Sequence, residues 1–220
     1  MSLNPRCSIL LIAFVAVTVA AADKKPWKDA SVSVGDIKIH YIEAGAGDHS
    51  LVFIPGWTMN AEIWKEQIPY FTSRNFRVIA IDPRSQGQTT KTEQGNSYFQ
   101  HAADLVAFLK ALKLDRQQTT LVGWSAAVET LLEYISSPET GQPEHFVFVD
   151  GFPLVRRETD YPSGAMTYTL QQVRTMFLGI EEDRAKAADK YVRGLFKATQ
   201  SELLYRELAD GSLKTPTGTA

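Results

Sequence analysis

The segment Thr119-Thr120-Leu121-Val122-Gly123-Trp124-Ser125-Ala126-Ala127 decides the fold of this chain. Its first six residues are typical of a strand, and a helix-forming run over 126–135 follows Ser125 at once. A strand, a tight turn and a helix in this order indicate a nucleophile elbow, in which a serine on a strained turn exposes its hydroxyl. Gly123 and Ala127 flank the serine because the strand and the helix must pass close together there.

The helix start adds an electrostatic reason to single out Ser125. Unpaired backbone N–H groups and the positive end of the helix dipole lie there, where they would stabilise an oxyanion. The alternative is an ordinary strand-to-helix turn with a capping serine, because the Gly-x-Ser-x-Ala pattern is short and its residues are common. The rest of the chain has to decide between the two interpretations.

Composition places the chain among ordinary globular proteins. It has 220 residues, 44% of them hydrophobic and 22% charged, with a formal net charge of −2. This length predicts one domain, or one domain with an insertion. The sequence contains no block of Lys and Arg, so nucleic acid is not an expected partner. No group of His, Cys and Asp has the spacing of a metal site, and no glycine loop suited to phosphates is present, so no metal or cofactor is predicted.

The N-terminal residues 1–22 are predicted to be a secretory signal peptide. Arg6 precedes the apolar run 8–19, and Ala20-Ala21-Ala22 provides an Ala-x-Ala cleavage site. An uncleaved membrane anchor is the alternative, but the run is short for a span of roughly 20 residues. Cleavage after Ala22 would remove Cys7, the only cysteine, and leave no stable membrane span. We therefore expect a secreted or periplasmic protein without disulfides.

Strands alternate with helices in the next part of the chain. Residues 30–34 and 37–42 alternate apolar and polar around Gly35-Asp36, which predicts a hairpin. Further strands are predicted at 51–54, 76–81 and 146–149, and helices at 61–71, 97–112 and 126–135. This order predicts an α/β fold with a mostly parallel sheet and helices on both faces.

Candidate site residues gather where the predicted strands end. Pro55-Gly56-Trp57, Asp82, Ser125 and Asp150 each follow a strand directly. In open parallel sheets, ligands bind at the carboxyl ends of the strands. We therefore expect these residues to border one site.

The strand pattern stops after residue 152, which suggests three parts for the mature chain. Residues 23–152 are predicted to be the α/β core, and 153–212 a helical insertion that covers the site as a lid or cap. Apolar residues at helical spacing support that insertion: Met166, Leu170, Val173 and Phe177, then Tyr191, Val192, Leu195 and Phe196, with a third helix over 201–209. The alternative is ordinary packing helices. Residues 213–220 are predicted to be a tail that leads to a missing strand.

Four motifs resemble the α/β-hydrolase family, in the branch of small esterases, lipases and cofactor-free haloperoxidase-like enzymes. They are Leu51–Trp57, similar to the oxyanion strand and loop; Asp82–Thr89, similar to the Asp-x-Arg-x-x-Gly-x-Ser/Thr loop; the elbow Gly123–Ala127; and the strand Phe146–Asp150. The chain departs from the family at Pro55, where many members have histidine, and at Ala127, where glycine is usual. The resemblance covers residues 30–152 well.

The resemblance implies roles for several residues. Ser125 would attack the carbonyl carbon of a small carboxylic ester and form an acyl-enzyme. The backbone N–H groups of Ala126 and Trp57 would hold the oxyanion. Trp57 and Trp124 would line an apolar acyl pocket or, alternatively, serve only in packing. Asp82 and Arg84 would be structural.

The triad is where the chain departs most from the family, whose order is serine, acid, histidine. None of His40, His49, His101 and His145 follows Ser125 at the family's position, so we expect surface or strand-edge histidines. Asp150 is the candidate for a displaced acid, or else a plain turn residue.

Two strand–helix units of the family, roughly 60 residues at about 30 per unit, are expected to be missing at the C-terminus. The sequence thus predicts a truncated serine hydrolase with little turnover. The alternative is a catalytically inactive, hydrolase-like binding protein or a gene fragment. Acyl transfer or perhydrolysis on the same serine is a third possibility that the sequence does not separate from hydrolysis. The oligomeric state is left open.

Overall fold

The computed structural model describes residues 25–115, 117–137, 143, 145–151 and 170–219. The predicted signal peptide, Cys7 and Met166 lie outside these residues. In the part of the chain that is described, no helix is long and apolar enough to cross a membrane.

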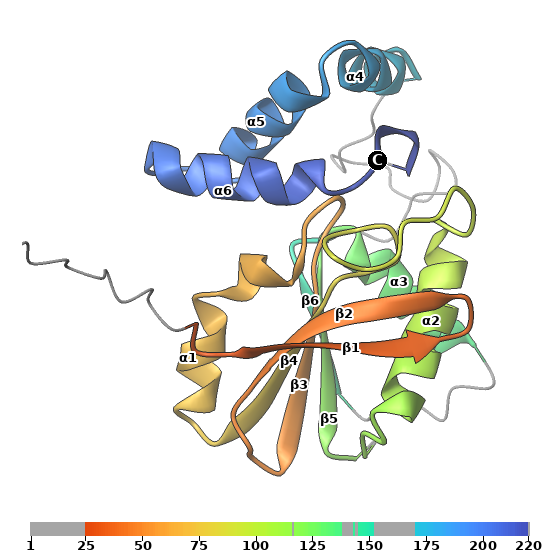
Figure 1. Cartoon of the computed structure of the whole chain (residues 1–220), viewed down its shortest axis with the longest axis vertical. Coiled ribbons are helices and arrows are strands. Elements are labelled where there is room, and N and C mark those ends of the chain that lie inside the picture. Colours follow the sequence, from red (N-terminus) through yellow and green to blue (C-terminus); the bar gives the residue numbers. More distant parts are fainter. Residues whose placement is uncertain (1–24, 116, 138–142, 144, 152–169, 220) are drawn as a thin grey trace, which may run out of the picture.

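The described residues form one six-stranded sheet with the order β1-β2-β4-β3-β5-β6 (Figure 1). Its strands are β1 (Lys28–Val34), β2 (Ile37–Ala44), β3 (His49–Ile54), β4 (Phe76–Ile81), β5 (Thr119–Trp124) and β6 (His145–Val149). The pairs β1–β2 and β2–β4 are antiparallel, and the other three pairs are parallel. The α/β fold with a mostly parallel sheet is therefore confirmed, including the N-terminal hairpin.

The central strands are buried on both faces because their alternate side chains enter two different cores. Val52 and Ile54 of β3 join one cluster with Leu105 and Phe108, residues of helix α2 (Tyr98–Ala111). Helix α3 (Ala127–Ser136) contributes to the same cluster. Phe53, the residue between the two, packs in a second cluster under helix α1 (Gln67–Thr72). Helices thus cover both faces of the sheet, as predicted.

The predicted helix over 61–71 is wrong as a single element. A 3-10 turn, η1 (Ala61–Trp64), is followed by the short helix α1, with Lys65 and Glu66 between them. Pro69 lies inside this segment, and proline lacks the N–H that a continuous helix would need. Trp64 of η1 and Ile68 of α1 are nevertheless both buried in the same apolar cluster.

Three helices form a further layer over the carboxyl ends of the strands (Figure 1). They are α4 (Leu170–Glu182), α5 (Arg184–Gly194) and α6 (Glu202–Leu213). Met59, from the loop after β3, packs with Ala188 and Val192 of α5 and with Tyr205 and Leu208 of α6. This apolar cluster attaches the helical layer to the loop beside the predicted site.

Residues 214–219, which the sequence predicts as part of a tail, are held against the same loop. Thr215 is buried, and its hydroxyl donates to the carbonyl oxygen of Thr58 at 3.3 Å. Ser212 Oγ lies 2.8 Å from Thr58 Oγ1. A 3-10 turn, η3 (Thr217–Thr219), follows.

Strand β6 is the last strand of the sheet over the residues described and pairs only with β5. Its side chains Val147 and Phe148 are 45% and 47% exposed. Within the described residues, the sheet therefore ends in an apolar edge.

Candidate active site

Ser125 stands on a strained turn at the tip of β5. Its φ is +54°, a left-handed conformation that costs energy for a residue other than glycine. Two backbone hydrogen bonds maintain the turn: the Ser125 N–H donates to Val149 O at 2.9 Å, and the Val128 N–H donates to Ser125 O at 2.9 Å. The first bond joins the elbow to β6 and the second joins it to α3. The strand–turn–helix geometry predicted from the sequence is therefore present.

Small residues allow the elbow to pack this tightly. A Cβ at Gly123 would lie 2.7 Å from Leu131 Cδ1 and 3.0 Å from Ala127 O. A Cβ at Gly151 would lie 2.3 Å from Val128 Cγ2 and 2.7 Å from Ser125 O. The close approach of strand and helix explains Gly123, as predicted.

The loop after β3 reaches Ser125 through Gly56. A Cβ at Gly56 would be 3.0 Å from Ser125 Cβ and 3.3 Å from Trp124 O. The loop turns sharply there, because the Met59 N–H donates to Gly56 O at 3.1 Å and Thr58 has a φ of +59°. Trp57 therefore follows a residue that touches the serine.

Two backbone donors next to Ser125 are unpaired. Within the described chain, the N–H groups of Trp57 and Ala126 donate to no other group. Ala126 is the N-cap residue of α3, where N–H groups are left without intrahelical partners. Such a pair of donors beside a serine hydroxyl is the chemistry of an oxyanion hole.

Asp150 lies at the end of β6, next to the elbow strand. Its φ is +44° and its side chain is exposed. Its carboxylate forms no hydrogen bond or ion pair with another described residue, and neither does the hydroxyl of Ser125. The predicted role of Asp150 as a displaced acid thus stays a prediction.

The expectation that all four histidines lie at the surface or at strand edges is wrong for His40. This side chain is 6% exposed, with Nδ1 2.8 Å from Asp82 Oδ2 and Nε2 3.1 Å from Asp29 Oδ1. Burial lowers the pKa of His40, but the two carboxylates raise it by more, so that the pKa lies above its usual value. His40 therefore pairs with Asp82 as a structural group.

The remaining histidines occupy two different places. His49 begins β3, at the opposite end of the strand from Gly56, and its Nε2 lies 2.8 Å from Thr120 Oγ1. The ring of His145 lies 6.2 Å from that of His49. His101 is on the first turn of α2 and borders a cavity near the elbow. No histidine of the described residues is hydrogen-bonded to Ser125.

Asp82 and Arg84 have the structural roles that the resemblance implies. The carboxylate of Asp82 accepts from the N–H groups of Ala61 and Gln88, each at 2.7 Å. Arg84 donates to both oxygens of Asp104 at 2.8 and 2.9 Å and to those of Asp36 at 3.0 and 2.7 Å. These contacts hold the loop after β4 against the hairpin and α2.

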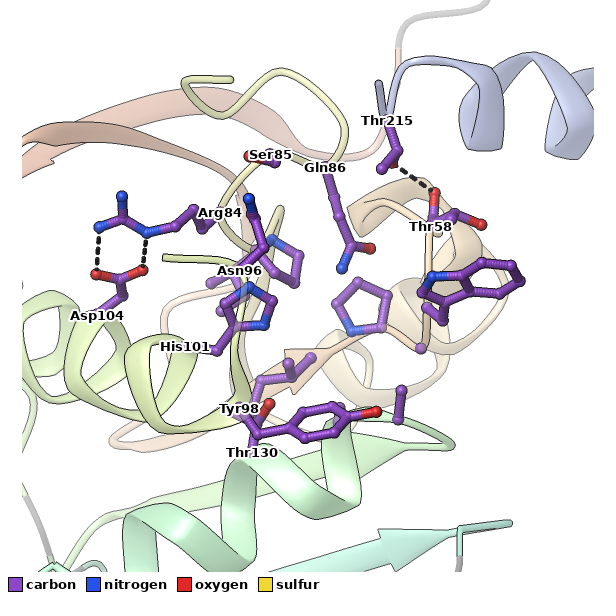
Figure 2. A pocket seen from close by; sticks show the side chains of 18 of the residues that line it. Thr58, Arg84, Ser85, Gln86, Asn96, Tyr98, His101, Asp104, Thr130 and Thr215 are labelled. Atoms are coloured by element: carbon purple, nitrogen blue, oxygen red, sulfur yellow. Dashed lines mark hydrogen bonds and ion pairs between the residues drawn. The ribbon is translucent and has the colours of Figure 1, made fainter. Parts of the chain in front are cut away.

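A cavity of about 340 Å³ lies beside the elbow (Figure 2). Its wall includes Gly56, Trp57 and Ala126, but Ser125 itself does not line it. Trp57 thus borders a cavity, as its predicted role in lining an acyl pocket requires. Trp124 instead packs against the apolar clusters of the core and of the helical layer. The polar part of the wall, from Gln86, Asn96 and His101, had no recognisable signal in the sequence.

Comparisons with known proteins agree with this geometry. The sequence profile described as "alpha/beta hydrolase fold" matches residues 49–136, which include β3, β4, the elbow and α3. A non-heme chloroperoxidase of Streptomyces lividans is 31% identical over 110 residues, 50% of this chain and 39% of that protein. The human serine hydrolase BPHL is 31% identical over 110 residues, 48% of this chain and 37% of that protein.

A solved structure supports the same assignment. The bromoperoxidase of Bacillus anthracis superimposes with a TM-score of 0.77 at 27% identity, covering 87% of this chain and 71% of that one. The chain spans about half the length of the curated relatives that it matches. With the strand order, the elbow and the matched profile, these findings show that the chain has the α/β-hydrolase fold and is similar to members of that family.

Proposed function

We propose that this protein is a secreted serine hydrolase that acts on small carboxylic esters through an acyl-enzyme on Ser125. One observation carries the proposal: Ser125 stands on a left-handed turn beside two backbone N–H groups, of Trp57 and Ala126, that have no partner in the described chain. The similarity to a serine hydrolase and to non-heme haloperoxidases supports it.

The reaction follows from the geometry of the turn. Ser125 Oγ forms a bond to the carbonyl carbon, and the carbonyl oxygen becomes an oxyanion that accepts from the Trp57 and Ala126 N–H groups. The bond to the alkoxy group then breaks, and the serine proton leaves with the alcohol. Water cleaves the acyl-serine, releases the carboxylic acid and restores the hydroxyl.

Proton transfer limits the rate in this proposal. Neither a histidine nor a carboxylate of the described residues is hydrogen-bonded to Ser125 Oγ. A serine without a hydrogen-bonded base keeps its proton and is a weak nucleophile, so acylation is slow. We therefore expect slow turnover that depends on Ser125.

Hydrolysis of p-nitrophenyl acetate by the full chain tests the proposal. Ser125→Ala should reduce the rate to that of the uncatalysed reaction. The control is Ser136→Ala, which changes an exposed serine at the end of α3 and should leave the rate unchanged. If Ser125→Ala is as active as the parent, the assignment of the nucleophile is wrong. If the parent chain hydrolyses the ester at rates typical of esterases and Ser125→Ala abolishes this activity, the nucleophile is correctly assigned but the expectation of slow turnover is wrong.

A second candidate is a hydrolase-like protein that binds a ligand without turning it over. The hydroxyl of Ser125 has no partner among the described residues, which favours this candidate because a serine without a base is a weak nucleophile. In that case, p-nitrophenyl acetate would be hydrolysed at the background rate by the parent chain and by both variants.

Export is part of the proposal and rests on the sequence of residues 1–22. Expression of the full chain in a bacterial host tests it. The expected result is a product outside the cytoplasm whose N-terminus is Asp23. A product that stays in the cytoplasm with residues 1–22 attached would contradict it.

A further inference from the structure

We propose that the cavity beside the elbow binds a small, uncharged part of the ester substrate that carries hydroxyl groups. The inference rests on the proposed function, because it names the substrate class of the same site. It is carried by three side chains that enter the cavity from the loop after β4 and from α2: Gln86, Asn96 and His101 (Figure 2).

Each of these side chains has a buried polar atom without a partner among the residues that the structure describes. The atoms are Gln86 Oε1, Asn96 Oδ1 and His101 Nε2. The orientation of the Asn96 amide is fixed, because its Nδ2 donates to Thr92 O at 3.0 Å, which leaves Oδ1 as the free acceptor. Gln86 is 8% exposed, and its amide projects into the space between His101 and Thr58 (Figure 2). Buried polar atoms without partners are costly, and these three acceptors at one cavity match a ligand that brings hydroxyl donors to them.

The charges around the cavity disfavour an ionic ligand. Arg84 and Asp104 line it, but the guanidinium and the carboxylate neutralise each other through two hydrogen bonds. Burial lowers the pKa of His101, and nearby Arg84 lowers it further against the opposing effect of Asp104. The imidazole is therefore neutral at neutral pH. Hydroxyl hydrogens of the ligand can donate to the neutral imidazole and to the amide oxygens.

The remaining wall and the size of the cavity indicate the rest of the ligand. Ile39, Ile54, Ile81 and Leu105 supply an apolar surface. At about 30 Å³ per water molecule, a cavity of about 340 Å³ holds a group of roughly ten non-hydrogen atoms. Gly56 lines the cavity, and a Cβ built on Gly56 would lie 3.0 Å from Ser125 Cβ, so the cavity is close to the nucleophile.

A pair of esters that differ only in two hydroxyl groups tests the proposal. They are 2,3-dihydroxypropyl butanoate and propyl butanoate, titrated into the full-chain Ser125→Ala variant and followed by calorimetry. This variant cannot be acylated, so the measurement reports binding alone. We expect the dihydroxy ester to bind about tenfold more tightly, the effect of one or two hydrogen bonds to buried acceptors.

The Gln86→Met change, made in the same variant, should abolish most of this preference. It replaces an amide that has no partner by an apolar side chain of similar size, so the melting temperature should stay unchanged or rise. His101→Phe is the second variant, with the same expected loss of preference. Gln94→Leu is the control, since this exposed glutamine lies in the same loop but does not line the cavity.

The proposal is overturned if propyl butanoate binds as tightly as the dihydroxy ester. It is also overturned if neither ester binds up to its solubility, or if both cavity variants retain the preference. Its failure is distinguishable from failure of the proposed function. Acylation of Ser125 without a hydroxyl preference would refute this inference alone. A preference that depends on Gln86, in a protein whose Ser125 is never acylated, would refute the proposed function alone.

Discussion

Gly56 and Ser125 are in such close contact that a single methyl group on Gly56 would lie 3.0 Å from Ser125 Cβ. The loop that carries the Trp57 N–H is thereby positioned by direct contact with the serine turn. Any side chain at position 56 must move either the loop or the turn, and each movement separates the donor from the oxyanion that it would bind. The oxyanion site therefore depends on glycine at this position.

Gly56→Ala tests this relationship. We expect a Ser125-dependent esterase rate at least tenfold lower than that of the parent. Complete loss of an oxyanion donor lowers kcat about 10²- to 10³-fold, and displacement of the donor should cause part of that loss. Stability should fall by about 1–3 kcal/mol from overpacking, as measured by urea denaturation. The control is Gly179→Ala on α4, where a Cβ meets nothing within 4 Å. That change should leave the rate unaltered and stabilise the helix by about 0.5–1 kcal/mol. An unchanged rate in Gly56→Ala would refute the proposed role of the contact.

Arg84→Met should destabilise the fold much more than the equivalent change at the surface. Arg84 is 4% exposed and its partner Asp104 is 7% exposed, so removal of the guanidinium leaves a buried carboxylate unpaired. The expected loss is about 3 kcal/mol in the free energy of unfolding. Arg193→Met is the matched control. Arg193 pairs with Asp189 and Glu202, but all three side chains are well exposed, and the expected loss is much smaller because solvent screens exposed ion pairs. Equal losses would contradict the structural role of Arg84.

His40 and His101 should titrate on opposite sides of the ordinary histidine pKa of 6.5. The raised pKa of His40 means that the folded chain binds its proton more tightly than the unfolded chain. The stability from His40 is therefore fully present below about pH 6.5 and is lost as the pH rises through the raised pKa. His101 has a lowered pKa, so it destabilises the fold as the pH falls from about 6.5 through that lowered value.

Histidine NMR titrations and urea denaturation at several pH values check this prediction. The stability difference between the parent and His40→Gln should shrink from pH 6 to pH 8. The free energy of unfolding of the parent should fall relative to that of His101→Gln as the pH falls below 6.5. If the two histidines titrate at the same pH, the proposed opposite shifts of their pKa values are wrong.

Ser212→Ala should weaken the attachment of the helical layer. Ser212 is fully buried, and its hydroxyl is hydrogen-bonded to that of Thr58 in the loop that precedes the Met59 cluster. Loss of this bond should cost about 1 kcal/mol and make α4–α6 more sensitive to limited proteolysis. Ser136→Ala, at an exposed position, should change neither quantity. If Ser212→Ala is no more sensitive to proteolysis than the parent, the apolar contacts of Met59 are enough to hold the helical layer in place.

Local patterns were enough to predict the sheet and the elbow. Each buried strand of the core has a run of apolar residues, and Gly123 and Ala127 flank Ser125 because of contacts within one short segment. The broken helix at 61–72 was missed because apolar spacing continues across Lys65 and Glu66 although the backbone hydrogen bonds do not.

The cavity could not be predicted, because it depends on residues that only the fold brings together. Gln86 follows β4, His101 belongs to α2 and Thr215 lies beyond α6, and nothing in the spacing of these residues indicates that they share a wall. The burial of His40 was missed for the same reason. Its partner Asp82 is 42 residues away and becomes a neighbour through the pairing of β2 with β4, while Asp29 lies on the other strand of the hairpin.

The central claim is that Ser125 is the acylated nucleophile, and mass spectrometry of the full chain after incubation with p-nitrophenyl acetate tests it most directly. The account predicts a slowly formed adduct of one acetyl group, mapped to the peptide that contains Ser125 and absent from Ser125→Ala. The Ser136→Ala control should acquire the adduct at the parent rate. An acetyl group found on another residue, or an adduct that persists in Ser125→Ala, would contradict the account.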